Sequence, residues 1–385
     1  MTKVKTVNNF HNRSNNKTNN FVKRLKSLIP NKMNKSLFII IALTFCLSTI
    51  SSCKKDDEHT MHHDEQAILN IDYPAAYVVN GESNNLSVIK LSDNTVSEII
   101  QLNGATFPHH IYINPAKTKL AVAITATDLS DGHAGHGSTV AGLKVQIIDA
   151  VTGKIDKEIA LPKMPHNAIF NAQGTELWIG QMDTIQSQVL IYKTSDWTLQ
   201  NTINVGKGLS EVTFSNDGSM AFACNTLDGT VTVIDANTKM INATLTVGIY
   251  PVGAWSASNG KMYVDNEMSQ TVSEISVGSM IVTSTINLGF KPGYVAYNTL
   301  SSELWVSDAT NGKVVYYNLI GGVWTLKGNI LTGADAHAIT FNSDETKAYV
   351  TNQGVGSVSV IDVASHMVSQ VITVGSKPNG IVLKQ

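Results

Sequence analysis

The sequence predicts an all-β protein: a seven-bladed β-propeller with four antiparallel strands in each blade. Three observations support this prediction. One apolar strand recurs seven times, the segments between its copies alternate between apolar and polar residues, and turn-forming residues are abundant. The chain has 385 residues, including 28 Gly and 9 Pro, and only 15% of its residues are charged. Four short strands in every forty-odd residues are typical of one propeller blade.

The recurring strand is a short apolar run that often ends in Asp or Asn. Its copies follow one another at spacings of 41 to 44 residues, except for one spacing of 57 between the second and third copies. The copies are Ala76–Asn80, Leu120–Ala123, Leu177–Gly180, Ala221–Asn225, Met262–Asn266, Leu304–Asp308 and Ala348–Asn352. We interpret each copy as the second strand of a blade, because β-branched and aromatic residues flanked by turn residues indicate strands.

The other three strands of each blade follow from the same repeat. An alternating strand such as Thr230–Asp235 comes next, and a further strand ends in Val-Gly, as at Thr246–Gly248. A corner that often contains Pro, such as Pro251, then opens the first strand of the next blade. The earliest recognisable strand, around Tyr77, is a second strand, whereas the chain ends on a first strand at Gly380–Leu383. We therefore expect the C-terminal strand to complete the first blade and close the ring, which removes exposed sheet edges.

The residues before the repeats read as an export signal. Residues 1–32 are Asn-rich and basic, and we interpret them as a disordered leader or a misassigned start, with Met1 or Met33 as the true first residue. Leu37–Leu47 is an apolar run of eleven residues, too short to span about 30 Å of hydrocarbon but suited to a signal peptide. The predicted segments are therefore a lipoprotein signal peptide at 33–53, an acidic and His-containing tether at 54–66, and the propeller at 67–385.

Cys53 is the predicted lipidation site. The string Ile50–Cys53 resembles the bacterial lipobox, in which the Cys is lipidated and becomes the new N-terminus; the alternative is an ordinary signal peptide cut near Ser52. Acyl chains would anchor the chain by burying CH₂ groups worth about 0.8 kcal/mol each. The tract Lys54–Glu58 resembles the acidic tether of surface lipoproteins of Bacteroidetes. We therefore expect an outer-membrane lipoprotein of the cell envelope, on the periplasmic side or exposed at the surface.

Charge and cysteine content exclude several classes of protein. The formal net charge is −2, from 28 basic and 30 acidic residues, so the chain lacks the basic face of a nucleic-acid binder. Two of the three cysteines lie near the N-terminus, which excludes a disulfide framework. The sequence also contains no phosphate-binding Gly-rich loop and no GxSxG motif. We expect a monomer with no nucleic-acid partner.

A family resemblance supports the same fold. The string Tyr349–Asn352, followed by SVSVID and VGSKPNG, resembles the YVTN-repeat β-propellers, here of the Bacteroidetes lipoprotein type. The resemblance covers residues 76–385. It implies a seven-bladed ring and says little about activity, because one fold hosts many functions.

Histidines gather at the starts of the first strands. Aligning the corners places His109, His166 and His337 at one repeat position, with His110 and Glu211 next to them. The first strand of every blade lines the central channel of a propeller, so equivalent positions lie at one height around one axis. We therefore expect these imidazoles to converge at one mouth of the channel.

A second histidine group lies in the longest repeat. About thirteen additional residues near Asp128–Gly142 include His133 and His136, in the string GHAGHG. First strands run away from the face that carries the corners, and second strands return to it. The loop after the second strand, and with it His133 and His136, is therefore expected on the same face as the channel-mouth histidines.

This grouping predicts a transition-metal site. Its candidate ligands are His109, His110, His166, His337, His133 and His136. Zinc takes neutral imidazole nitrogens at about 2.0–2.1 Å, usually in four-fold coordination. Copper is the other candidate, because Met61, Met182 and Met268 are expected near this face and thioethers favour Cu(I). The alternative interpretation is that these histidines bind only water or backbone carbonyls and that the Gly-His loop is a linker.

Two further resemblances bear on the metal. The propeller of nitrous oxide reductase also holds copper with channel histidines, but this chain lacks that enzyme's cupredoxin domain and cysteine ligands, so reductase activity is not expected. Exported propellers that act as zinc metallochaperones pair a His-bearing tether with a His site on the propeller. This sequence is similar in that arrangement, with His59, His62 and His63 in the tether.

The predicted function is a lipid-anchored, non-enzymatic propeller that binds zinc or copper and acts as a metal carrier or capture protein, with an outer-membrane transporter or metal-transport component as partner. One alternative is a surface module that captures an organic ligand, such as a corrinoid or glycan, for an outer-membrane transporter, as some YVTN-like lipoproteins do. A second alternative is a lactonase-like hydrolase, because seven-bladed propellers include lactonases. In that case His109 and Glu211 would supply the catalytic pair.

Overall fold

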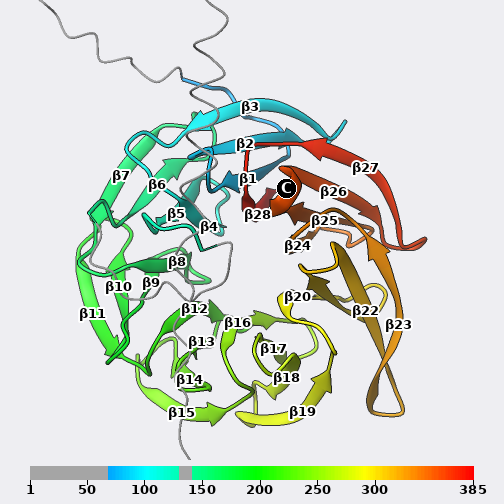
Figure 1. Ribbon diagram of the computed structural model, residues 1–385. Helices are drawn as coiled ribbons and strands as arrows, with labels where there is room; N and C mark the ends of the chain where they lie inside the picture. Colours follow the sequence, from blue (N-terminus) through cyan, green and yellow to red (C-terminus); the bar gives the residue numbers. More distant parts are fainter. Residues whose placement is uncertain (1–67, 130–140) are drawn as a thin grey trace, which may run out of the picture. The chain divides into compact units, whose positions relative to one another are not determined.

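Seven four-stranded antiparallel sheets surround a central channel in the computed structural model, which describes residues 68–129 and 141–385 (Figure 1). The predicted leader, signal peptide and tether lie outside the described residues, as do Cys53, His133 and His136. Within the described ranges there is no helix with the length and hydrophobicity needed to cross a bilayer. The predicted fold class, a seven-bladed β-propeller, is confirmed.

Each blade contributes one strand to each of four concentric layers (Figure 1). The innermost strands are β28 (Pro378–Lys384), β4 (Pro108–Ile113), β8 (Pro165–Phe170), β12 (Leu209–Phe214), β16 (Pro251–Ser256), β20 (Pro292–Asn298) and β24 (Ala336–Phe341). The second strands are β1 (Ala75–Asn80), β5 (Lys119–Ile124), β9 (Glu176–Gln181), β13 (Met220–Asn225), β17 (Lys261–Asn266), β21 (Glu303–Asp308) and β25 (Lys347–Asn352).

The two outer layers complete the blades. The third strands are β2 (Asn85–Lys90), β6 (Lys144–Asp149), β10 (Gln188–Lys193), β14 (Thr230–Asp235), β18 (Thr271–Ser276), β22 (Lys313–Ile320) and β26 (Ser357–Asp362). The outermost strands are β3 (Thr95–Gln101), β7 (Ile155–Ala160), β11 (Leu199–Asn204), β15 (Ile241–Thr246), β19 (Ile281–Asn287), β23 (Val323–Leu331) and β27 (Met367–Thr373). A short 3-10 helix, η2 (Gln353–Val355), follows β25.

The C-terminal strand closes the ring, as predicted. Strand β28 pairs antiparallel with β1, with Val382 opposite Tyr77, and takes the innermost place in the first blade. The segment before β1 reinforces this blade. Ile71 is fully buried, its N–H donates to Val151 O at 2.9 Å, and Lys384 Nζ donates to its carbonyl. The first blade is thus tied both to the end of the chain and to the neighbouring blade.

The core lies between the blades and is built largely by the second strands. All residues of β1 are buried, whereas those of the outermost strand β15 are exposed or half-buried. Six of the seven second strands carry one large aromatic residue that is almost fully buried: Tyr77, Trp178, Phe222, Tyr263, Trp305 and Tyr349. Burying each such side chain contributes about 1.5–3 kcal/mol or more. The apolar second strand is therefore the element that joins one blade to the next.

The Val-Gly corners explain why Asn ends many second strands. Asn225 Oδ1 accepts a hydrogen bond from Gly206 N at 2.9 Å, and a Cβ at Gly206 would lie only 2.6 Å from Asn225 Cγ. A Cβ at Gly375 would likewise lie 2.6 Å from Cγ of Asn80. Only glycine allows this approach, so in these blades the pair of residues fixes where the inner strand begins relative to the second strand.

Candidate metal-binding site at the channel mouth

Three histidines meet where the inner strands β4 and β8 begin. His109, His110 and His166 are 4%, 6% and 0% exposed, and one ring nitrogen from each lies within 4.8 Å of the others. The ring centroids of His109 and His166, which belong to different blades, are 4.6 Å apart. The predicted convergence of imidazoles from separate repeats is present in the structure for these three residues.

A β-bulge at the start of each inner strand makes this cluster possible. Pro108 pairs with Ile124 and Ile111 with Val122, so that His109 and His110 together oppose the single residue Ala123. An ordinary strand would send consecutive side chains to opposite faces, whereas a bulge redirects one of them. The two neighbouring histidines therefore both reach the cluster, with ring centroids 4.3 Å apart.

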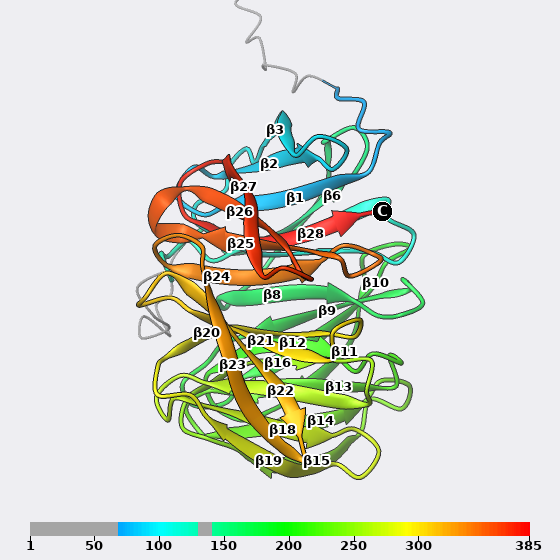
Figure 2. The ribbon, with the colours of Figure 1, turned by 90° about the vertical axis from the view of Figure 1, so that its right-hand side faces the viewer.

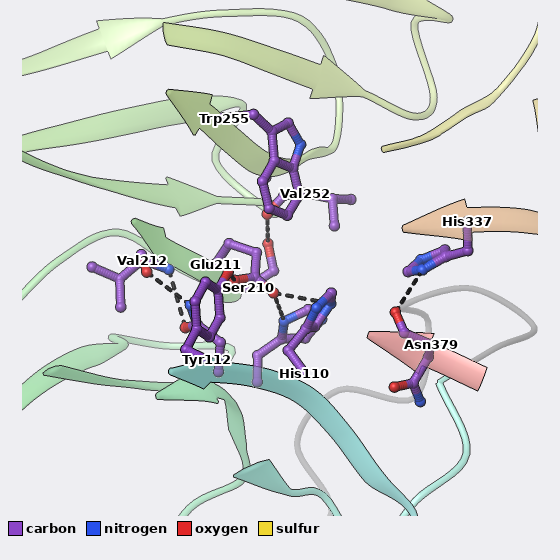
Figure 3. A network of polar contacts seen from close by, with 12 residues as sticks. His110, Tyr112, Ser210, Glu211, Val212, Val252, Trp255, His337 and Asn379 are labelled. Atoms are coloured by element: carbon purple, nitrogen blue, oxygen red, sulfur yellow. Dashed lines mark hydrogen bonds and ion pairs between the residues drawn. The ribbon is translucent and has the colours of Figure 1, made fainter. Parts of the chain in front are cut away.

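Glu211 stands at the centre of the polar network (Figure 3). This fully buried residue of β12 has its Oε1 at 2.9 Å from His166 Nδ1 and 3.1 Å from His110 Nε2. Its Oε2 accepts a hydrogen bond from the Tyr112 hydroxyl at 3.1 Å, on the side away from His110 in Figure 3. Burial, and then the charge of Glu211, raise the pKa of Tyr112 well above its usual value. Tyr112 therefore remains a neutral hydrogen-bond donor to the carboxylate.

His337 lies beside the cluster rather than in it. Its ring centroid is 6.0 Å from that of His110, and its Nδ1 is 2.9 Å from the carbonyl oxygen of Asn379 (Figure 3). Asn379 in turn donates through Nδ2 to Pro108 O at 3.2 Å. The structure thus places His337 at the predicted mouth, where Asn379 links β24 to the corner that carries His109.

The insertion in the second blade starts on the predicted face. Asp128 lies in the loop after β5, just before the gap in the described residues. It forms an ion pair with Lys377 at the corner before β28. Of the predicted methionines, Met182 is 2% exposed and belongs to the core, Met268 is exposed in the turn after β17, and Met61 lies outside the described ranges. Met182 is therefore a packing residue.

The donor set fits a transition metal. Two nitrogens bound to one zinc at about 2.1 Å each lie at most about 4.2 Å apart, so rotations that move the ring nitrogens by less than about 1 Å would let the three imidazoles share an ion. A cation in this position would also offset the charge of the buried carboxylate, which is costly to bury alone. Glu211 Oε1 lies at hydrogen-bond distance from one nitrogen of His110 and one of His166, so the carboxylate would orient both rings around a shared ion.

Sequence reasoning missed a second buried acid near the channel. Asp265 of β17 is fully buried opposite the bulge of β16, and its Oδ1 accepts hydrogen bonds from Gly253 N at 3.1 Å and Trp255 Nε1 at 2.7 Å. Burial raises its pKa to about 7. The sequence feature that could have identified Asp265 is a carboxylic acid inside an otherwise apolar recurring strand, at the position that Cys224 occupies in the preceding repeat.

Fold and site together define a seven-bladed β-propeller with a histidine cluster at one channel mouth, and known proteins share the fold. No family model matches the chain. It is 24% identical over 256 residues to the uncharacterized protein YncE of Salmonella typhimurium, covering 61% of this chain and 70% of that protein. A functionally unknown protein from Desulfotomaculum acetoxidans superposes with a TM-score of 0.65 at 12% identity, covering 80% of this chain and 98% of that one. The periplasmic gluconolactonase of Pseudomonas aeruginosa superposes with a TM-score of 0.64 at 17% identity, covering 81% and 99%.

Proposed function

We propose that this propeller binds a transition metal, zinc or copper, at the channel mouth and acts as a non-enzymatic metal carrier or capture protein. One observation carries the proposal: three imidazoles from two blades place ring nitrogens within 4.8 Å of one another. Imidazole suits both metals, and zinc commonly takes three protein ligands plus one exchangeable position. An open position is what a carrier needs in order to release its cargo.

Glu211 is the positioning residue in this proposal. Metal-binding imidazoles commonly donate their second N–H to a carboxylate, which fixes the ring orientation and raises the basicity of the ligand nitrogen. Glu211 Oε1 lies at hydrogen-bond distance from a nitrogen of both His110 and His166. Since the carboxylate itself is fully buried, its orientation is set by the fold before any ion arrives.

The predicted anchor extends the proposal to the cell envelope. A lipidated Cys53 would hold the propeller at the outer membrane, and His133 and His136 in the insertion would add donors at the same mouth. A membrane transporter or metal-transport component is the partner that this arrangement would serve.

Metal analysis of the purified chain tests the proposal. The protein, prepared without a His tag and dialysed, is expected to retain about one equivalent of metal and to bind Zn(II) in competition with a chromophoric chelator. His109→Ala with His166→Ala is expected to weaken zinc binding by about 100-fold or more. Because His166→Ala also removes a partner of the buried Glu211, the melting temperature of this variant is expected to fall, and zinc binding is measured at a temperature at which the variant is still folded. The matched control is His366→Ala, since His366 lies away from the mouth and is bonded to Glu303 at 2.9 Å.

A double variant that binds zinc as tightly as the wild type would contradict the proposed site. Stabilisation of the chain by a corrinoid or a glycan, without an effect of metals, would instead favour the organic-ligand alternative.

A lactone hydrolase is the second candidate function. The similarity to the gluconolactonase of Pseudomonas aeruginosa, which covers 81% of this chain, favours this candidate. The buried His166–Glu211 pair at 2.9 Å also favours it, because a histidine oriented by a carboxylate can act as a general base. Turnover on a panel of lactones that Glu211→Gln abolishes would support this candidate. Absence of turnover by the metal-loaded and the metal-free protein would dismiss it.

A further inference from the structure

The channel opens into a separate chamber at the end opposite the histidines. The inner strands run in a common direction, as β8 and β28 do in Figure 2, from the corner face to the opposite face. The chamber has a volume of about 450 Å³ and is lined by residues at or next to the ends of six inner strands: Ile113, Phe170, Phe214, Ser256, Tyr297 and Phe341. It therefore uses the same strands as the histidine cluster, but their other ends.

The chamber walls are uncharged and combine aromatic rings with polar side chains. Among the described residues that line it there is no Asp, Glu, Lys, Arg or His. The polar groups are hydroxyls and amides, such as those of Ser215, Thr340 and Asn171. Asn216 and Ser256 are exposed at the rim, which leaves the chamber open to solvent. These walls offer a ligand ring contacts and neutral hydrogen bonds, and no partner for an ion.

Three aromatic side chains form a floor between the chamber and the histidines. Tyr112, Trp255 and Tyr294 line the chamber, and the rings of Trp255 and Tyr294 lie 3.7 Å apart at 32°. The Tyr112 hydroxyl donates to Glu211 and the Trp255 Nε1–H donates to Asp265. Because these polar atoms are already bonded to buried carboxyl groups, ring carbon is what Tyr112 and Trp255 offer to a ligand in the chamber.

We infer that the chamber is a second binding site, for a small neutral molecule that carries an aromatic ring. Its volume lies within the range of ligand pockets, about 300–1,000 Å³. Aromatic rings pack favourably against one another beyond the effect of buried area, whereas an ion would lose its hydration without gaining a charged partner. This inference is independent of the metal proposal, since it uses other residues at the other end of the channel.

A neutral fluorescent dye tests the inference on the purified full chain. N-phenyl-1-naphthylamine, whose emission rises in apolar surroundings, is expected to bind saturably. Thr340→Trp fills the chamber and is expected to weaken binding about tenfold or more. The matched control is Thr285→Trp on the exposed outermost strand β19, which is expected to bind the dye as the wild type does.

Two further measurements make the test decisive. Ala296→Asp places a charge on the chamber wall and replaces Thr340→Trp should that variant fail to fold; it too is expected to weaken dye binding. The anionic dye 1-anilinonaphthalene-8-sulfonate is expected to bind about tenfold more weakly than the neutral dye. Unchanged affinity in the chamber variants, or equal affinity for the two dyes, would overturn the inference. Retained dye binding in the double variant His109→Ala, His166→Ala would show that the two sites are separate.

Discussion

The two ends of the channel are built from the same inner strands and have opposite chemistry. At their starts these strands bring together His109, His110, His166 and Glu211, all buried. At their ends they surround an uncharged chamber lined by aromatic and polar side chains. The strand starts are bulged, so that pairs of consecutive residues change direction, whereas the strand ends keep regular pairing.

This difference shows how one repeat yields two kinds of site. A bulge interrupts the alternation of side chains between the two faces of a strand, so that neighbouring polar residues can point toward the same position. With regular pairing, equivalent residues of the inner strands point in the same direction relative to the channel axis. Aromatic residues at equivalent positions therefore gather at one height. The floor formed by Tyr112, Trp255 and Tyr294 lies between the two environments.

Removing the floor is expected to have the largest effect. Trp255→Ala deletes a side chain that is 8% exposed and packs on Tyr294, and it also takes the indole donor away from Asp265. We expect a loss of about 4–5 kcal/mol in the free energy of unfolding, measured by urea denaturation. Trp255→Phe, which retains a ring against Tyr294, is expected to lose less; equal losses in the two variants would mean that the lost indole hydrogen bond, rather than the packing of the ring, accounts for the cost.

The buried acid beside the floor is expected to make stability depend on pH. Because the pKa of Asp265 is raised to about 7, the folded state holds a proton that the unfolded state has already released, so stability falls as pH rises from about 4 to about 7. Between pH 5 and pH 8 the expected loss from this residue is about 3 kcal/mol.

Asp265→Asn tests this pH dependence, because the amide oxygen still accepts both hydrogen bonds while the titrating group is gone. Urea denaturation of the variant is expected to show a flatter dependence on pH than that of the wild type. Parallel curves for the two proteins would contradict the assignment.

Glu211→Gln tests the role of the buried carboxylate at the histidine end of the channel. The substitution keeps the size of the side chain but removes the charge that lies 2.9 Å from His166 and 3.1 Å from His110. Zinc affinity is expected to fall by about 10–100-fold, as for other residues that orient metal ligands. Dye binding in the opposite chamber is expected to be unchanged, and a parallel loss of both activities would indicate general unfolding instead.

Tyr112→Phe is expected to have the smallest effect. The variant loses the hydroxyl that donates to Glu211 Oε2 but keeps the ring that faces the chamber. We expect a loss of about 1–2 kcal/mol in unfolding free energy and an unaltered affinity for the neutral dye. Weaker dye binding would show that the hydroxyl, rather than the ring, contributes to the chamber.

The fold could be predicted almost completely from the sequence, because its signal is local and repeated. The predicted second strand Met262–Asn266 falls within β17, and the pairing of the C-terminal strand with β1 follows from counting first and second strands. Strand alternation and turn residues act over a few positions, so that seven imperfect copies reinforce one another.

The site could be predicted only in part. Repeat alignment brought His109 and His166 to one mouth, and Glu211 beside them, but it treated His337 as equivalent, whereas His337 Nδ1 faces the carbonyl of Asn379. The bulge that lets His110 join His109 depends on strand pairing, which the alternation pattern of one strand does not encode. The burial of Asp265 likewise depends on which residue of the neighbouring strand faces it.

The aromatic floor has a consequence for the proposed metal site. Tyr112, Trp255 and Tyr294 lie between the histidines and the opposite chamber, so an ion bound as proposed would leave through the same channel mouth by which it entered. The protein that delivers the ion and the protein that receives it would then have to use this mouth one after the other, and the order of their binding would set the direction of transfer.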